Sequence, residues 1–212
     1  KNKSVLADVQ PGNLVNVFWK SRLIEQMGKF KIELISSVSG KIFDEKIKLQ
    51  ALNSLCSLLD KFLPERQNYS EIFNATKAFI NLLTLQDERK NYHWIEGYVK
   101  WEIGVLSSIG FSLDLKRCAV TGANTNLLFV SPKTGKAVSK EAAGIHAPRL
   151  LLLPFFLGGE EVIGSNFYKE ILAGLKITSY FFKNKLLLSI NTKKPINLPS
   201  PRIRFVELIE KL

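Results

Sequence analysis

Residues 52–83 read LNSLCSLLDKFLPERQNYSEIFNATKAFINLL, and this stretch decides the fold because its apolar side chains recur every three or four positions. That spacing places them along one face of a helix. Pro64 ends the first predicted helix, and Ser70 is a suitable N-cap for the second. A third helix, closed by Gly110, has its own apolar stripe: Trp94, Tyr98, Trp101, Val105 and Ile109. Together the three helices predict a packed helical core.

The residues before this stretch predict antiparallel β structure. Pro11-Gly12 marks a turn, and residues 14–20 are rich in β-branched and aromatic side chains. From Lys29 to Glu33, polar and apolar residues alternate, which is typical of a strand with one packed and one solvated face. Because two strands alone do not make a stable unit, we expect the end of a small β-barrel whose earlier strands are not in this sequence.

The residues after the three helices predict a small β-hairpin inserted among further helices. Residues 127–130 are apolar, and residues 131–135, SPKTG, are typical of a turn. Helical spacing resumes at Ser165, and Ser200-Pro201 begins the last helix. The predicted fold class is therefore α+β. A β segment occupies residues 1–38, and a mostly α-helical domain occupies 39–212, with the hairpin insertion at about 117–139.

The charge of the chain indicates an anionic partner. The formal net charge is +11, with an excess of four basic residues over 110–150 and six over 165–212. A field of this sign attracts nucleic acid, an acidic membrane or an acidic protein tail. A surface whose lysines serve only solubility is the alternative interpretation.

Cysteine content and hydropathy indicate the compartment. The two cysteines, Cys56 and Cys118, cannot form a disulfide framework, which favours a reducing environment. No apolar run reaches the roughly 18 residues that a membrane span needs, and no secretory signal is present. We therefore predict a cytoplasmic protein without a membrane partner.

The sequence offers no set of residues for catalysis. The two histidines, His93 and His146, have no neighbouring Ser or Cys that would make a nucleophile–base pair. Residues 131–137, SPKTGKA, resemble a phosphate-binding loop but lack its first glycine and the Ser or Thr that holds magnesium. We therefore predict no enzymatic activity.

Residues 118–122, CAVTG, have the form of a zinc knuckle with one ligand. Thr121 stands where a second cysteine would be, and Ser139 and Ala142 stand at the spacing of the downstream pair. Zinc needs a closed set of thiolates or imidazoles, so we expect no metal and no cofactor. Apolar side chains are expected to hold the hairpin instead: Val120, Leu128, Val130 and Val138.

Glu102 lies one turn after Tyr98, close to the apolar stripe of the third helix. A partly buried carboxylate must find a partner or raise its pKa. We expect an ion pair with an arginine, such as Arg117 or Arg149.

Basic residues are the candidate nucleic-acid contacts. In the β segment they are Lys20, Arg22, Lys29 and Lys31. Phe18, Trp19 and Phe30 lie between them, as a stacking surface for single strands requires. The alternative is that these rings face the barrel core, and for Phe30 we expect the core. A second concentration near the carboxyl end includes Lys183, Lys185, Lys193, Lys194, Arg202 and Arg204. In this second group Arg202 and Arg204 are the candidate DNA contacts. A solvated helix face explains the concentration of basic residues equally well.

Four segments resemble the RecO family of bacterial recombination mediators, especially its α-proteobacterial branch. They are QPGNLV (10–15), YVKWEIGVL (98–106), IGFSLDLKRCAVTG (109–122) and FVSPKTGKAVS (129–139). The resemblance implies an amino-terminal OB-fold, a helical domain and a hairpin that often binds zinc. In this chain the zinc ligands are reduced to Cys118, and the front of the OB-fold is absent.

The resemblance also implies partners. Members bind single- and double-stranded DNA, anneal complementary strands, associate with RecR and bind the acidic tail of the single-strand DNA-binding protein. In this way they help to load RecA, without a chemical step, in the cytoplasm at the nucleoid. By position Lys20, Arg22, Lys29 and Lys31 lie in what is left of the OB-fold, and Arg117, Lys133 and Lys136 are candidate contacts to a carboxylate.

Two alternatives stay open. The chain could mainly dock proteins, the acidic tail or RecR, and bind DNA only weakly, because its helical core is almost neutral. A nucleic-acid enzyme with a dispersed active site is the other alternative.

Overall fold

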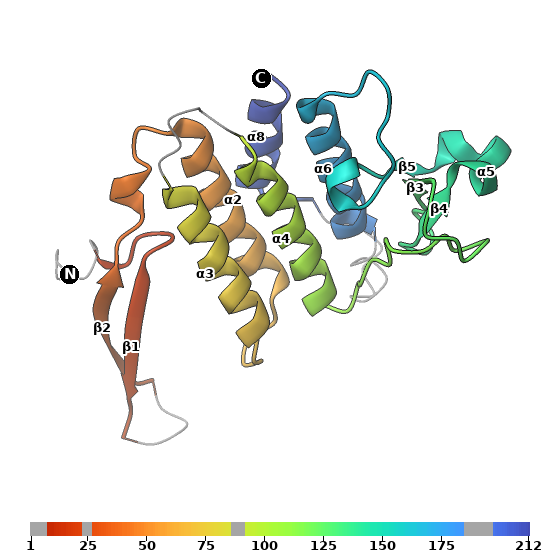
Figure 1. Ribbon diagram of the computed structural model, residues 1–212. Helices are drawn as coiled ribbons and strands as arrows, with labels where there is room; N and C mark the ends of the chain where they lie inside the picture. The colour runs from red at the N-terminus through yellow and green to blue at the C-terminus, as the bar shows by residue number, and fades with distance from the viewer. Residues whose placement is uncertain (1–7, 23–26, 86–91, 185–196) are drawn as a thin grey trace.

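The computed structural model describes residues 8–22, 27–85, 92–184 and 197–212 (Figure 1). Its α-helices are α2 (Lys46–Phe62), α3 (Ser70–Thr84), α4 (Trp94–Ser108), α5 (Lys140–Ala143), α6 (Phe167–Asn184) and α8 (Ser200–Ile209). Its strands are β1 (Leu14–Lys20), β2 (Lys29–Ser36), β3 (Leu127–Val130), β4 (Ala137–Ser139) and β5 (Leu151–Leu152). Within the described residues, short 3-10 helices lie in the connections: η1 (Ser39–Lys41), η2 (Gly144–Arg149) and η3 (Phe155–Leu157). The predicted mixture of helices and small sheets is confirmed.

The long helices lie in the middle of the molecule, with the β1–β2 hairpin at one end and the three-stranded sheet at the other (Figure 1). The closest helix pairs are α2 with α8, α3 with α4, and α4 with α6. None of the helices that the structure describes is long and apolar enough to cross a bilayer.

The ends of the three predicted helices follow local signals. α2 ends at Phe62, two residues before Pro64, and Gly110 adopts a φ of +91° directly after α4. The predicted cap of α3 is wrong by one residue, because Tyr69 is the N-cap. Ser70 is already helical, and its amide donates a hydrogen bond of 3.0 Å to the side-chain oxygen of Asn68.

Tyr98 of α4 lies at the centre of the helical core. Its ring is fully buried and contacts Phe79 of α3 and Phe205 of α8, with centroid distances of 5.6 and 4.6 Å. The Tyr98 hydroxyl shares a hydrogen bond of 2.6 Å with Ser54 of α2. Burial and the nearby Glu102 carboxylate raise the pKa of this hydroxyl well above its usual value. One side chain thus joins four helices.

A buried ion pair joins α4 to α8. The Nε and Nη2 atoms of Arg202 donate to the two carboxylate oxygens of Glu102 at 2.5 and 3.0 Å, and Thr178 of α6 donates to the same carboxylate. All three side chains are buried. The expected ion pair of Glu102 with an arginine is confirmed. The arginine is Arg202, in a bidentate arrangement, and neither of the two named examples, Arg117 and Arg149.

The β1–β2 hairpin has two chemically different faces. Residues directly opposite in an antiparallel pair share a face, and the register pairs Val17 with Ile32 and Phe18 with Lys31. One face, called here the apolar face, consists of Val15, Val17, Trp19, Phe30, Ile32 and Leu34. The other consists of Asn16, Phe18, Lys20, Lys29, Lys31 and Glu33. The described strands form no closed barrel, and Phe30 is 66% exposed rather than in a core.

The inserted hairpin is present and forms part of a three-stranded antiparallel sheet in the order β4-β3-β5. Val130 and Val138 are buried in it, as expected. The expectation that Val120 helps to hold the hairpin is wrong, because it lies in the turn closed by the Gly122 amide and the Cys118 carbonyl and is 71% exposed. Gly135 makes the β3–β4 turn with a φ of +72°.

Candidate nucleic-acid interface

The lysine-bearing face of the β1–β2 hairpin is the candidate nucleic-acid interface. Lys20 and Lys29 are direct partners across the two strands, and Lys31 follows on the same face. All three side chains are exposed. We call this surface the basic face and define it by Lys20, Lys29, Lys31 and the aromatic Phe18.

The basic face concentrates charge at a cost to stability. Like charges directly opposite in a sheet repel one another, so the Lys20–Lys29 pair does not stabilise the hairpin. The Lys31–Glu33 ion pair, 2.6 Å long, is exposed and contributes little. Bound phosphates would relieve the repulsion between the lysines. Arg22, exposed two residues after β1, adds a further cation at this end of the hairpin.

The register separates the three aromatic residues that the sequence suggested for stacking. Phe18 shares the basic face and lies beneath Lys31, whose Nζ is 5.9 Å from the ring centroid. Trp19 and Phe30 are direct partners of each other on the apolar face. The expectation that all three aromatics lie among the cations is therefore wrong, because side chains alternate along a strand.

The candidate DNA contacts near the carboxyl end differ in their exposure to solvent. Arg202 is buried and bonded to Glu102, so the expectation that it contacts DNA is wrong. Arg204, two residues later on α8, is exposed. Lys183 is exposed at the end of α6, and Lys185, Lys193 and Lys194 lie outside the described residues.

The candidate contacts to a carboxylate gather around the small sheet. Arg117, Lys133 and Lys136 are exposed. The loop that carries Arg117 is hydrogen-bonded to β4, where the amide of Ala119 donates to the carbonyl of Ala137 at 2.8 Å. Arg117 and Lys136 are therefore placed on neighbouring segments, and Lys133 lies in the β3–β4 turn.

Cys118 lies beside Ser139, as the zinc-knuckle spacing suggested. The Ser139 amide donates to Cys118 Sγ at 3.3 Å. Burial raises the pKa of this thiol, but hydrogen bonds from Thr121 and Ser139 outweigh it and lower the pKa to about 6. Within the described residues, no group of three His, Cys, Asp or Glu side chains comes together as a metal site would require.

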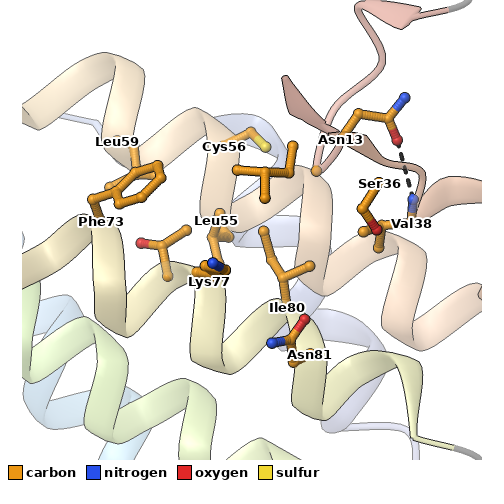
Figure 2. A pocket seen from close by; sticks show the side chains of 13 residues that line it. Asn13, Ser36, Val38, Leu55, Cys56, Leu59, Phe73, Lys77, Ile80 and Asn81 are labelled. Carbon is orange, nitrogen blue, oxygen red and sulfur yellow. Dashed lines mark hydrogen bonds between the residues drawn. The ribbon is translucent and has the colours of Figure 1, made fainter. Parts of the chain in front are cut away.

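A pocket that sequence reasoning missed opens where the hairpin meets α2 and α3 (Figure 2). Its volume is about 220 Å³. The lining residues are Gly12, Asn13, Leu14, Ser36, Val38, Leu55, Cys56, Leu59, Phe73, Thr76, Lys77, Ile80 and Asn81. Among these described residues, Lys77 alone carries a charge. Four segments of the chain form the pocket (12–14, 36–38, 55–59 and 73–81), so no local motif predicts it.

Asn13 holds the mouth of this pocket together. Its side-chain oxygen accepts a hydrogen bond of 3.1 Å from the amide of Val38 (Figure 2). Its side-chain nitrogen donates to the carbonyl of Asp8. Gly12 allows the turn before β1 to approach α2, because a Cβ there would lie 2.8 Å from a methyl group of Leu52. Burial raises the pKa of the Cys56 thiol in the wall, so this cysteine is protonated at neutral pH.

Comparison with known proteins gives consistent matches. Residues 47–194 match the family model described as "Recombination protein O C terminal". The chain is 36% identical to a DNA repair protein RecO of Rhodospirillum rubrum, over 100% of this chain and 82% of the relative. It is 38% identical to that of Rhodospirillum centenum, over 96% of this chain and 77% of the relative.

A third relative, the DNA repair protein RecO of a Wolbachia strain, is 37% identical over 88% of this chain and 77% of its own length. No solved structure matches the chain. Since the family model covers more than half of the chain and these relatives match most of it, the chain belongs to the recombination protein O (RecO) family.

Proposed function

We propose that this protein is a DNA repair and recombination mediator that captures DNA on the basic face of its β1–β2 hairpin. The single observation that carries the proposal is the placement of three exposed lysines and Phe18 on one face of a two-stranded sheet. The names of its relatives, DNA repair proteins, agree with this function. Lysine contacts to phosphates give affinity without sequence preference, which suits a protein that acts on any damaged DNA.

The proposed action involves binding alone. The protein binds single- and double-stranded DNA, brings complementary strands together, and with RecR helps RecA to load onto DNA covered by single-strand DNA-binding protein, in the cytoplasm at the nucleoid. We assign no chemical step to it. Lys20 and Lys29 contribute to the driving force. When their ammonium groups bind phosphates, the counterions condensed on the DNA are released.

The fold proposal follows the same division. We propose that residues 1–38 belong to an OB-fold and that 39–212 form a helical domain with a zinc-ribbon-like hairpin insertion. Six apolar side chains on one hairpin face support the first part, because such a face is suited to packing against further β structure. The start of the matched family model at residue 47, near the first residue of α2, supports the second.

A second candidate function, docking of an acidic protein tail, is supported by the pocket in Figure 2. Its wall is mainly apolar, and its one charge is the cation Lys77. An apolar side chain next to a carboxylate fits that chemistry. Arg117, Lys133 and Lys136 at the small sheet are the competing location. A Phe73→Asp variant and an Arg117→Glu/Lys136→Glu variant, titrated with an acidic-tail peptide, separate the two locations by which one loses affinity.

The DNA-binding proposal is tested by titrating the full chain into fluorescent single- and double-stranded oligonucleotides at several salt concentrations. We expect binding that weakens steeply as salt increases, with both oligonucleotides recovered intact. Absence of binding at low salt would overturn the proposal and would favour the docking function. Cleavage of either strand would contradict a mediator without a chemical step.

A further inference from the structure

Phe18 is the one large aromatic side chain on the basic face of the hairpin. Its cross-strand partner is Lys31, and the next pair on the same face is Lys20 with Lys29. Phe18 is 52% exposed beside these lysines, and an exposed aromatic ring next to cations is the surface on which single-stranded nucleic acids bind.

We propose that Phe18 is the base-stacking position of this face and that its preferred ligand is single-stranded DNA, whose bases are free to stack. The inference rests on the proposed DNA-binding function and adds a strand preference to it. Stacking on an aromatic ring tolerates every base because each has a π face. Bases in a duplex are already stacked on their neighbours, so a duplex gains from the lysines alone.

The geometry supports simultaneous contacts to a base and its phosphates. Phe18 and Lys20 are two residues apart on β1, which corresponds to about 7 Å along a strand. The ammonium group of Lys31 is 5.9 Å from the Phe18 ring centroid. A nucleotide that stacks on Phe18 therefore meets Lys20 along the strand. It also meets Lys31, whose ammonium group now lies over the ring and pairs with Glu33 and turns to a phosphate when a base takes its place.

Neither of the other two hairpin aromatics can take this role beside the lysines. Trp19 and Phe30 project from the apolar face, as direct cross-strand partners. Phe30 is exposed to a similar extent as Phe18, at 66%. This similarity makes Phe30 a matched control, because the same substitution on the other face removes the same ring.

The test compares three labelled ligands of equal length, titrated with the full chain: oligothymidine, an abasic oligonucleotide and a duplex. The wild type is expected to bind oligothymidine about fivefold or more tightly than the abasic strand, the lower end of the range for one stacked base. Phe18→Leu is expected to remove this difference and leave abasic and duplex binding unchanged. Phe18→Trp is expected to keep it, and Phe30→Leu to leave the ratio as in the wild type.

The outcomes separate the inference from the function on which it rests. Salt-sensitive binding that is equal for oligothymidine and the abasic strand would overturn the role of Phe18 and leave DNA binding in place. Equal losses on all three ligands with Phe18→Leu would also overturn it. No binding to any ligand would remove the DNA-binding function itself. The wild-type comparison alone can overturn the inference, and loss of the preference in Phe30→Leu would overturn it as well, so the test does not depend on Phe18→Leu folding.

Discussion

Arg202 and Glu102 are separated by 100 positions in sequence, and their contact connects the last helix to the centre of the core. Each is 1% exposed or less, so the pair has been removed from water. Such a pair adds little net stability over an apolar replacement, but the loss of one partner leaves a buried, uncompensated charge. The pair therefore fixes the position of α8 more than it raises stability.

Removal of one partner is the first prediction. Arg202→Met is expected to lower the free energy of unfolding by about 3–5 kcal/mol, because Glu102 then stays buried without its partner. Urea denaturation measures the loss. The double variant Glu102→Gln/Arg202→Met is expected to lose less stability than Arg202→Met alone, because no buried charge is left without a partner. The control is Arg204→Met, exposed on the same helix and expected to change stability by less than about 0.5 kcal/mol. Equal small losses for both arginines would contradict the buried pair.

The second prediction concerns the Cys118 thiol. Its pKa is about 6 in the folded protein, against 9.0 for an ordinary cysteine. Between these values the unfolded chain keeps a proton that the folded protein has released, so stability rises with pH. The difference in the free energy of unfolding between the wild type and Cys118→Ser is thus expected to increase from pH 6 to pH 9. This extra stability is lost as the pH falls back to 6. Denaturant titrations at each pH measure it.

Cys56→Ser is the matched control for this pH series. Burial raises the pKa of Cys56, so both states keep its proton until the pH approaches 9 and the corresponding difference stays flat. A flat profile for Cys118→Ser as well would show that Thr121 and Ser139 do not stabilise a thiolate.

At the scale of elements, the hairpin and the helices follow from local patterns, whereas the pocket does not. Alternation from Lys29 to Glu33 predicts which residues share a strand face, and spacing of three and four predicts the helices. The register between β1 and β2 places Phe18, and not Trp19, on the same face as the lysines of β2. This register depends on how the two strands pair and cannot be read from either strand alone. The pocket needs the turn at Gly12 to meet α2, which no local pattern encodes.

The β3–β4 turn yields the third prediction. Gly135 has a φ of +72°, and an added Cβ would lie 2.9 Å from a methyl group of Leu113. Gly135→Ala is expected to cost about 1–2 kcal/mol, because an L-residue is strained in this conformation. Thermal unfolding measures the loss against Lys136→Ala, an exposed neighbour in the same turn. A loss no larger than that of the control would mean that the turn relaxes without strain.

Across the whole molecule, the two proposed contact regions lie at opposite ends. The hairpin with the basic face is at one end of the helices, and the sheet with Arg117, Lys133 and Lys136 is at the other (Figure 1). A tail held at the sheet would leave the hairpin open to DNA, whereas a tail held in the pocket of Figure 2 would lie next to the hairpin. The proposed function predicts that the location of charge, more than the net charge of +11, decides the affinity for DNA.

The salt dependence of DNA binding separates location from net charge. One variant replaces Lys20, Lys29 and Lys31 by glutamine, and its control replaces Lys46, Lys176 and Lys211, which are exposed elsewhere. Both lose three positive charges. Each phosphate contact contributes about 0.7 to the slope of log affinity against log salt for a single strand.

Measuring this slope for single-stranded DNA tests the central claim most directly. The account predicts that the hairpin variant lowers the slope by about 2, since three contacts are lost, and that the control variant leaves it nearly unchanged. Equal slopes for the two variants would contradict the account, because DNA affinity would then reflect net charge and not the basic face.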